Sequence, residues 1–245
     1  SRRQRQMCIR DRYKTGSFEI PDDTDSITKT IRLTASSETA WDGISASEPE
    51  LVDGVYQIGT GAELYWLACE VNKSGAQKDA DVVLTTDINL AGYPWTPIGT
   101  SSYVYTGTFD GNGHTIQNLY VNDAAYAGLF GMAKGKICNL TVDGDIFLKT
   151  KTSSGAIVGY LNMGTADAPA EISNCVSYVD ITYTGTSTSA NIGGIAGYAY
   201  ASSASNTVIK DCMNYGAIKA ENGGNVGGIL GDMISHNITI KNCTN

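Results

Sequence analysis

The sequence predicts a mainly β protein, a right-handed parallel β-helix (a solenoid) with one short N-terminal capping helix. Two patterns recur along the second half of the chain, a glycine-flanked apolar step and an Ile-x-Asn/Asp-Leu/Cys unit. Constant motifs at unequal distances are typical of a solenoid whose loops differ in length. The composition agrees, because 28 Gly, 5 Pro and only 17% charged residues suit short strands joined by tight turns.

The glycine-flanked step occurs four times, as AGLFG (127–131), GAIVG (155–159), GGIAG (193–197) and GGILG (227–231). Its closing residues are Gly131, Gly159, Gly197 and Gly231. Glycine lets the backbone turn and lets a neighbouring coil approach closely. The step therefore predicts a recurring corner in each coil.

The second pattern occurs as IQNL (116–119), ICNL (137–140), ISNC (172–175), IKDC (209–212) and IKNC (240–243). A third piece follows in most units, DIFL (145–148), VDIT (179–182) or GAIK (216–219), so we interpret each unit as a coil of three strands. Equivalent residues of successive coils should then stack about 4.8 Å apart. The predicted columns are an inward one of Ile116, Ile137, Ile172, Ile209 and Ile240, another of Leu119, Leu140, Cys175, Cys212 and Cys243, and a polar one of Asn118, Asn139, Asn174, Asp211 and Asn242.

The polar column has a structural and a functional interpretation. Stacked amides form hydrogen-bonded ladders along a β-stack, and the alternative is a row of ligand-binding amides. The cysteines are expected to be buried free thiols, because parallel stacking aims their Cβ vectors alike and spoils disulfide geometry. The six cysteines also lack C-x-x-C spacing, which argues against a zinc site. We expect no cofactor and no metal.

Residues 61–72 predict the one helix, since Leu64, Leu67, Ala68 and Val71 form an apolar stripe. Thr60 and Glu63 have the spacing of a capping box. Such a helix could cover the open end of a β-stack. We therefore assign residues 36–100 to an N-terminal cap that includes a strand at 82–90, and residues 101–245 to the coils, the last of which should lack its neighbour because the sequence stops mid-repeat.

The first residues differ from the rest of the chain. Residues 1–14 are strongly basic, and SRRQRQMCIRDR resembles a translated sequencing adapter, so we interpret 1–14 as an artefact or a disordered segment. The alternative is a basic arm that binds an anionic partner. Residues 15–35 are expected to be a linker or the end of a preceding domain.

Charge and hydropathy limit the partners. The net charge is −8 although the first residues are basic, which argues against a nucleic-acid partner. No apolar run reaches the 18 or more residues of a membrane span. No signal peptide is visible.

The glycine steps GLFG, AIVG, GIAG and GILG, each followed by I-x-N-C or a close variant, resemble the GLUG-motif repeats of bacterial surface proteins. The preceding LTTDINL…YPWTPIGT…YTGTFDGNGHTIQNL and GVYQIGTGAELYWLACEVN resemble the segments that lead into those repeats, so the resemblance covers roughly residues 38–245. It implies a β-helix in a large exported, often wall-attached protein, and no catalytic residues. Leu140 departs from the pattern, since later units have Cys there.

The function expected is therefore that of a non-catalytic, monomeric module of a larger extracellular or cell-surface chain, acting as a stalk, a spacer or an adhesive rod. Its partners would be an extracellular glycan or a host surface. Tyr160 and Tyr198 each follow a glycine step, and such an aromatic row could stack on sugar rings, although packing at a coil corner is the simpler interpretation.

The alternatives are a polysaccharide lyase or hydrolase, or an accessory region of a secreted peptidase. An enzyme would need carboxylates at a set separation, whereas Asp87, Asp110, Asp143, Asp145, Asp180, Asp211 and Asp232 are scattered along the chain. Three of them on one coil face would favour it. Residues 110–113 are expected to form a turn and not a calcium loop. His114 is a weak candidate for a general base.

Overall fold

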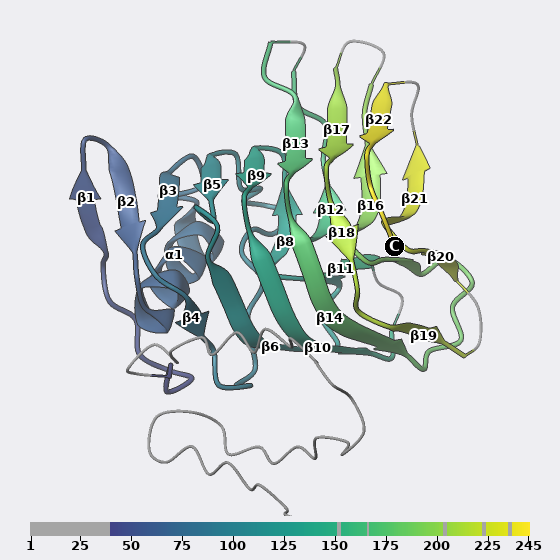
Figure 1. Ribbon diagram of the computed structural model, residues 1–245, viewed down its shortest axis with the longest axis horizontal. Helices are drawn as coiled ribbons and strands as arrows, with labels where there is room; N and C mark the ends of the chain where they lie inside the picture. Colours follow the sequence, from purple (N-terminus) through teal and green to yellow (C-terminus); the bar gives the residue numbers. More distant parts are fainter. Residues whose placement is uncertain (1–39, 151–152, 166, 203–204, 222–223, 235–236) are drawn as a thin grey trace, which may run out of the picture.

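The structure is a computed structural model that describes residues 40–150, 153–165, 167–202, 205–221, 224–234 and 237–245. The described chain is mainly β, with a single helix, which confirms the predicted class (Figure 1). The expectations for residues 1–14, which include Cys8, and for residues 15–35 lie outside the described residues.

The strands form four sheets, here called sheets I to IV. Sheet I contains β1 (Glu50–Val52), β2 (Val55–Ile58), β3 (Asp81–Leu84), β5 (Thr108–Asp110), β9 (Lys136–Cys138), β13 (Ala170–Ser173), β17 (Thr207–Lys210) and β22 (Ile238–Lys241). Sheet II contains β4 (Ile88–Asn89), β6 (Thr115–Asn122), β10 (Thr141–Leu148), β14 (Val176–Tyr183), β18 (Met213–Asn214) and β19 (Ile218–Ala220).

The other two sheets are built from shorter strands. Sheet III contains β7 (Tyr126–Ala127), β11 (Ser153–Gly155), β15 (Asn191–Gly193) and β20 (Asn225–Gly227). Sheet IV contains β8 (Phe130–Ala133), β12 (Val158–Leu161), β16 (Ala196–Tyr200) and β21 (Leu230–Ile234).

The chain passes through sheets I, II, III and IV in turn and then returns to sheet I, and we call one such passage a winding. The third winding, for example, runs through β9, β10, β11 and β12. Strands of successive windings pair in parallel, and the windings follow one another along the molecule from the purple to the yellow end (Figure 1). Among the described strands, β1 and β2 form the antiparallel pair.

The helix α1 (Gly61–Ser74) confirms the sequence prediction. Thr60 accepts from the Glu63 amide, and the Glu63 side chain accepts from the Thr60 amide, so the predicted capping box is present. The helix ends at Ser74, and Gly75 caps it in the left-handed conformation. Its stripe of Leu64, Leu67, Ala68 and Val71 is buried.

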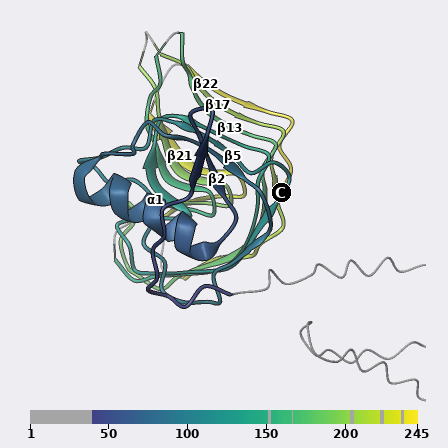
Figure 2. The same cartoon turned by 90° about the vertical axis from the view of Figure 1, so that its left-hand side faces the viewer.

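The position of α1 explains how one end of the stack is covered. The helix lies across the N-terminal end of the windings (Figure 2). The Asn72 side chain donates to the Pro97 carbonyl at 2.9 Å and accepts from the Gly99 amide at 2.8 Å. The helix therefore supplies both apolar cover and hydrogen bonds to backbone groups of the first winding, which would otherwise be exposed at an open edge.

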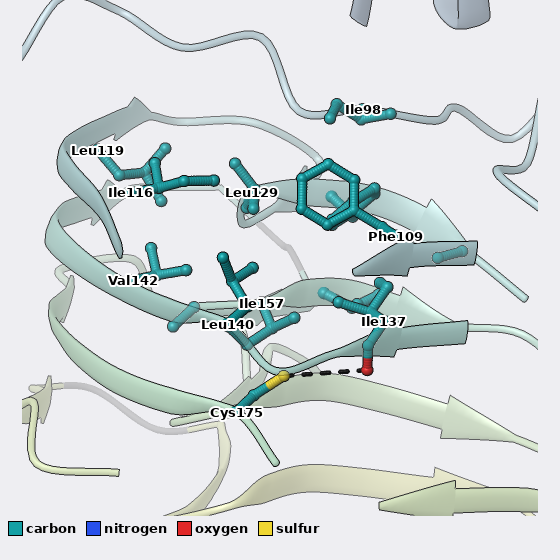
Figure 3. Packing of buried hydrophobic residues seen from close by; sticks show 14 of the residues in the cluster. Ile98, Phe109, Ile116, Leu119, Leu129, Ile137, Leu140, Val142, Ile157 and Cys175 are labelled. Carbon is teal, nitrogen blue, oxygen red and sulfur yellow. Dashed lines mark hydrogen bonds between the residues drawn. The ribbon is translucent and has the colours of Figure 1, made fainter. Parts of the chain in front are cut away.

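The interior is filled by columns of side chains from successive windings (Figure 3). In sheet I the register aligns Phe109, Ile137, Ile172, Ile209 and Ile240. The predicted placement of Ile116 in this column is wrong. Ile116 lies in sheet II, where its partners are Ile88 and Val142, and Phe109 takes the position expected for it.

The neighbouring columns need the same correction. Leu119 and Asn118 belong to sheet II and not to the corner that holds Leu140 and Asn139, because Leu119 is the register partner of Gly144. Leu140, Cys175, Cys212 and Cys243 occupy equivalent positions in successive windings. The amide of the residue that follows each cysteine donates to the carbonyl of the preceding member of the column. The column therefore begins at Leu140.

The predicted coil of three strands is also replaced by a winding through four sheets. Each glycine-flanked step is itself a corner between a sheet III strand and a sheet IV strand, as between β11 and β12. The Ile-x-Asn/Asp-Leu/Cys unit is the corner between sheets I and II. The strand expected at 82–90 is split into β3 and β4, which belong to different sheets.

Candidate functional site

The asparagines of the sheet I–sheet II corner have a backbone role that the sequence interpretation missed. Asn139, Asn174, Asp211 and Asn242 all have positive φ, between 52° and 55°. Asn and Asp tolerate this left-handed conformation better than other residues with a side chain. The sequence did contain a signal for this backbone conformation, because all four positions hold Asn or Asp.

The same side chains bond along the stack. Asn139 Nδ2 donates to Asp110 Oδ1 at 2.9 Å, and Asn174 Nδ2 donates to Asn139 Oδ1 at 2.8 Å. Asn242 Nδ2 donates to Asp211 Oδ1 at 2.9 Å. These amides are therefore engaged with one another, which is what a structural ladder requires.

The cysteines Cys138, Cys175 and Cys212 are buried, Cys243 is half-buried, and all four are free thiols. The Sγ atoms of Cys175, Cys212 and Cys243 each donate to the backbone carbonyl two residues earlier, at 3.1 to 3.3 Å, and lie 3.7 to 3.9 Å from an isoleucine carbonyl of the preceding winding. The contact with Cys212 and burial raise the pKa of the Cys175 thiol well above its usual range. A raised pKa keeps this thiol protonated and unreactive.

The closing glycines of the four steps lie where windings come closest. A Cβ at Gly131, Gly159, Gly197 or Gly231 would lie 2.2 to 2.8 Å from a backbone atom of the preceding winding. Such a contact is too short for any side chain, so these glycines are required for packing.

Tyr160 and Tyr198 are brought together, as register partners in sheet IV with ring centroids 4.9 Å apart. Tyr126 extends this tyrosine row, with its ring 5.7 Å from that of Tyr160. Both central rings are partly buried, and burial raises the pKa of Tyr160 and of Tyr198. Partial burial and contacts with neighbouring rings therefore leave Tyr160 and Tyr198 only partly open to a ligand.

A second group of aromatic and polar residues surrounds a pocket on the outer face of sheet II. This sheet II pocket has a volume of about 420 Å³. It is lined by Gly92, Asn118, Leu119, Tyr120, Asp143, Gly144, Asp145, Tyr178 and Asp180. The lining comes from four successive windings, so no single repeat encodes it.

The strand register explains how these residues meet. Asp145 is the partner of both Tyr120 and Asp180, and Asp143 is the partner of Tyr178. Three of the carboxylates that looked scattered in the sequence therefore lie on one face. Asp180 Oδ1 accepts from the Ala217 amide at 2.7 Å, which holds that side chain in place.

The remaining candidates have local roles. Asp110 Oδ1 accepts from the Asn112 amide within a turn between β5 and β6, in agreement with the predicted turn. His114 Nδ1 lies 3.2 Å from Asp87 Oδ1, which also accepts from the Thr115 amide. In the described part of the chain, no group of three His, Cys, Asp or Glu side chains is placed to hold one metal ion.

Comparisons with known proteins add the following. No family model matches the chain. A segment is 35% identical over 94 residues to a protein of Evansella cellulosilytica named "Putative Gly-rich membrane protein", which amounts to 36% of this chain and 11% of that protein. The chain thus spans about a tenth of the length of this curated relative. Within the described residues, no helix combines the length and hydropathy that a membrane crossing requires.

A solved structure has a similar fold. The crystal structure of a "putative immunoglobulin A1 protease" from Bacteroides ovatus superposes with a TM-score of 0.61 at 24% identity, over 82% of this chain and 69% of that one. At this identity the likeness concerns the fold alone, a parallel β architecture like that seen here.

Proposed function

We propose that the four sheets close into a right-handed β-helix, and that the protein is a non-catalytic rod within an exported or cell-surface protein. The observation that carries the proposal is the residue-for-residue register of the windings, in which Phe109, Ile137, Ile172, Ile209 and Ile240 align across sheet I. A stack of this kind gains stability at each interface between neighbours and extends in one direction. This is the mechanical requirement of a stalk or spacer.

Several observations support the extracellular part of the proposal. The repeats resemble GLUG-motif repeats, and their glycine steps occupy equivalent corners in four successive windings. The curated relative is named a membrane protein and the solved relative a protease of immunoglobulin A1, both of which fit a surface or secreted context. The partner in this proposal is an extracellular glycan or a host surface.

The spacer function can be tested by adding a winding. A second copy of residues 170–206 inserted after residue 206 would place another Ile172 between Ile172 and Ile209. We expect the variant to unfold cooperatively without a lower melting temperature. Spin labels on non-canonical residues at Thr86 and Lys219 should move apart by about 4.8 Å, the spacing of one strand.

The matched control is a scrambled insert of the same composition, which should destabilise the protein. An unchanged distance between the labels, or aggregation of the duplicated variant alone, would contradict the rod.

A second candidate function is polysaccharide cleavage, and the sheet II pocket is the observation that favours it. Glycosidases use two carboxyl groups that flank the scissile bond, and Asp145 and Asp180 are register partners in this pocket. Reducing ends released from a polysaccharide by the wild type, but not by Asp145→Asn or Asp180→Asn, would establish it. The rod proposal expects no release.

A third candidate is an accessory region of a secreted peptidase, for which the fold of the solved relative is the support. A proteolysis assay of the whole protein, with and without the windings, would test it.

A further inference from the structure

We infer that the sheet II pocket binds a neutral, hexose-containing polysaccharide, with Tyr178 as the stacking surface and Asp143, Asp145 and Asp180 as hydrogen-bond acceptors. The inference rests on the proposed contact function of the rod and gives it a place and a ligand class. It also places the glycan contact on the outer face of sheet II, and not at the tyrosine row.

The floor of the pocket is a β-bulge between β6 and β10. The other described strand pairs of sheet II have no such bulge. The register between β6 and β10 shifts between Val142 and Gly144, whereas β10 and β14 pair without interruption. Asn118 takes up the extra residue at φ 56°, and its Nδ2 donates to Asn89 Oδ1 at 2.8 Å. Bulges of this kind re-aim side chains and are common beside binding sites.

Gly144 completes the floor. It has φ of 146°, and a Cβ there would lie 2.0 Å from the Leu119 carbonyl oxygen. Any side chain at this position would collide with the backbone of the bulged strand β6 at Leu119. The pocket therefore depends on Gly144, and the bulge is the reason that this position must be glycine.

The aromatic wall is exposed, unlike the tyrosine row. Tyr178 stacks on Tyr215 with ring centroids 5.2 Å apart and an interplanar angle of 16°. The two residues are 50% and 59% exposed. A flat, pre-formed aromatic surface of this kind suits the apolar C–H face of a pyranose ring.

The polar wall determines which sugars fit. Ionised carboxylates only accept hydrogen bonds, so they match the hydroxyl donors of a sugar. None of the residues that line the pocket carries a positive charge, and three can carry a negative one. An acidic polysaccharide would therefore meet repulsion, while a neutral one would not.

A cation is a poorer occupant. Calcium requires six to eight oxygen ligands that converge on one point. Among the described residues no three acidic, His or Cys side chains converge in this way, so the carboxylates of the pocket are spread along its wall. That spacing suits successive hydroxyl groups.

The test is native affinity electrophoresis of the whole chain in gels that contain a β-glucan, a galactomannan or, as the acidic counterpart, polygalacturonate. We expect a neutral polysaccharide to retard the wild type and polygalacturonate not to. Tyr178→Ala should weaken the neutral interaction about tenfold, in line with the loss of an aromatic stacking contact. Tyr178→Phe should retain it.

The matched control is Tyr160→Ala in the tyrosine row, which should leave retardation unchanged. Asp145→Asn should weaken neutral binding and reduce the discrimination against polygalacturonate, and circular dichroism would show that each variant is folded. Three results would overturn the inference. They are no retardation by the β-glucan or by the galactomannan, loss of retardation in Tyr160→Ala but not in Tyr178→Ala, and loss of binding when a calcium chelator is added. The distance between labels in the variant with an added winding is independent of all these results, so failure of this site and failure of the rod are distinguishable.

Discussion

Asn174 donates a hydrogen bond from Nδ2 to Oδ1 of Asn139, 2.8 Å away in the preceding winding. Asn139 Nδ2 in turn donates to Oδ1 of Asp110 in the winding before it. Both asparagines also have left-handed backbones, so one residue type satisfies the turn and the ladder together. The corner between sheets I and II is stabilised by this double requirement.

The two contributions can be separated at Asn139. Asn139→Ala removes both ladder bonds and puts into the left-handed region a residue that tolerates it less well than Asn, which should lower the free energy of unfolding by about 2–4 kcal/mol. Asn139→Gly removes the bonds but keeps the backbone unstrained, so it should cost less. Urea denaturation of both variants measures the difference, and equal losses would show that the backbone conformation contributes nothing.

The isoleucine column gives a second prediction with an internal control. Ile209 is fully buried between two windings, so Ile209→Ala should lower the free energy of unfolding by about 2–5 kcal/mol. Ile240 is the same residue in the same column but is 45% exposed, and Ile240→Ala should cost clearly less. Chemical denaturation tests the pair. Similar values at both positions would mean that burial between windings is not the source of stability.

Thiol reactivity should follow burial. In denaturant all six cysteines are expected to titrate as free thiols. In the folded protein, studied in a Cys8→Ser background, the half-buried Cys69 and Cys243 should react first, and the buried Cys138, Cys175 and Cys212 only on unfolding. Mass spectrometry after timed alkylation reads out the order. Early labelling of Cys175 would be inconsistent with the packed column.

Asp42 provides a prediction for acid pH. The Ser45 hydroxyl, together with the backbone amides of Ser45 and Ile44, lowers the pKa of Asp42 from 3.8 to about 2. A lowered pKa stabilises the fold above the ordinary Asp value, and this contribution is lost as pH falls from about 3.8 through about 2. Carboxyl NMR titration should show the low midpoint in the wild type and a higher one in Ser45→Ala. An unchanged midpoint in the variant would assign the shift to another cause.

The aromatic residues show how far sequence reasoning reached toward a site. Tyr160 and Tyr198 were placed together because each follows a glycine step, and the structure brings their rings into contact. The sheet II pocket had no such signal. Asp145 and Asp180 occupy equivalent positions in successive repeats, but the register between windings is what brings Tyr120, Asp143 and Tyr178 beside them.

The sequence by itself determined the β class, the parallel stacking and the capping helix, because each depends on local pattern: glycine where windings approach, isoleucine between them, and an apolar stripe on 61–74. Tertiary structure alone decided that Ile116 and Asn118 lie outside the columns that the repeated motif predicts for them. The reason is physical. A column is defined by pairing between strands far apart in the chain, and in this winding Phe109 fills the sheet I position, so Ile116 pairs in sheet II although it carries the repeated motif.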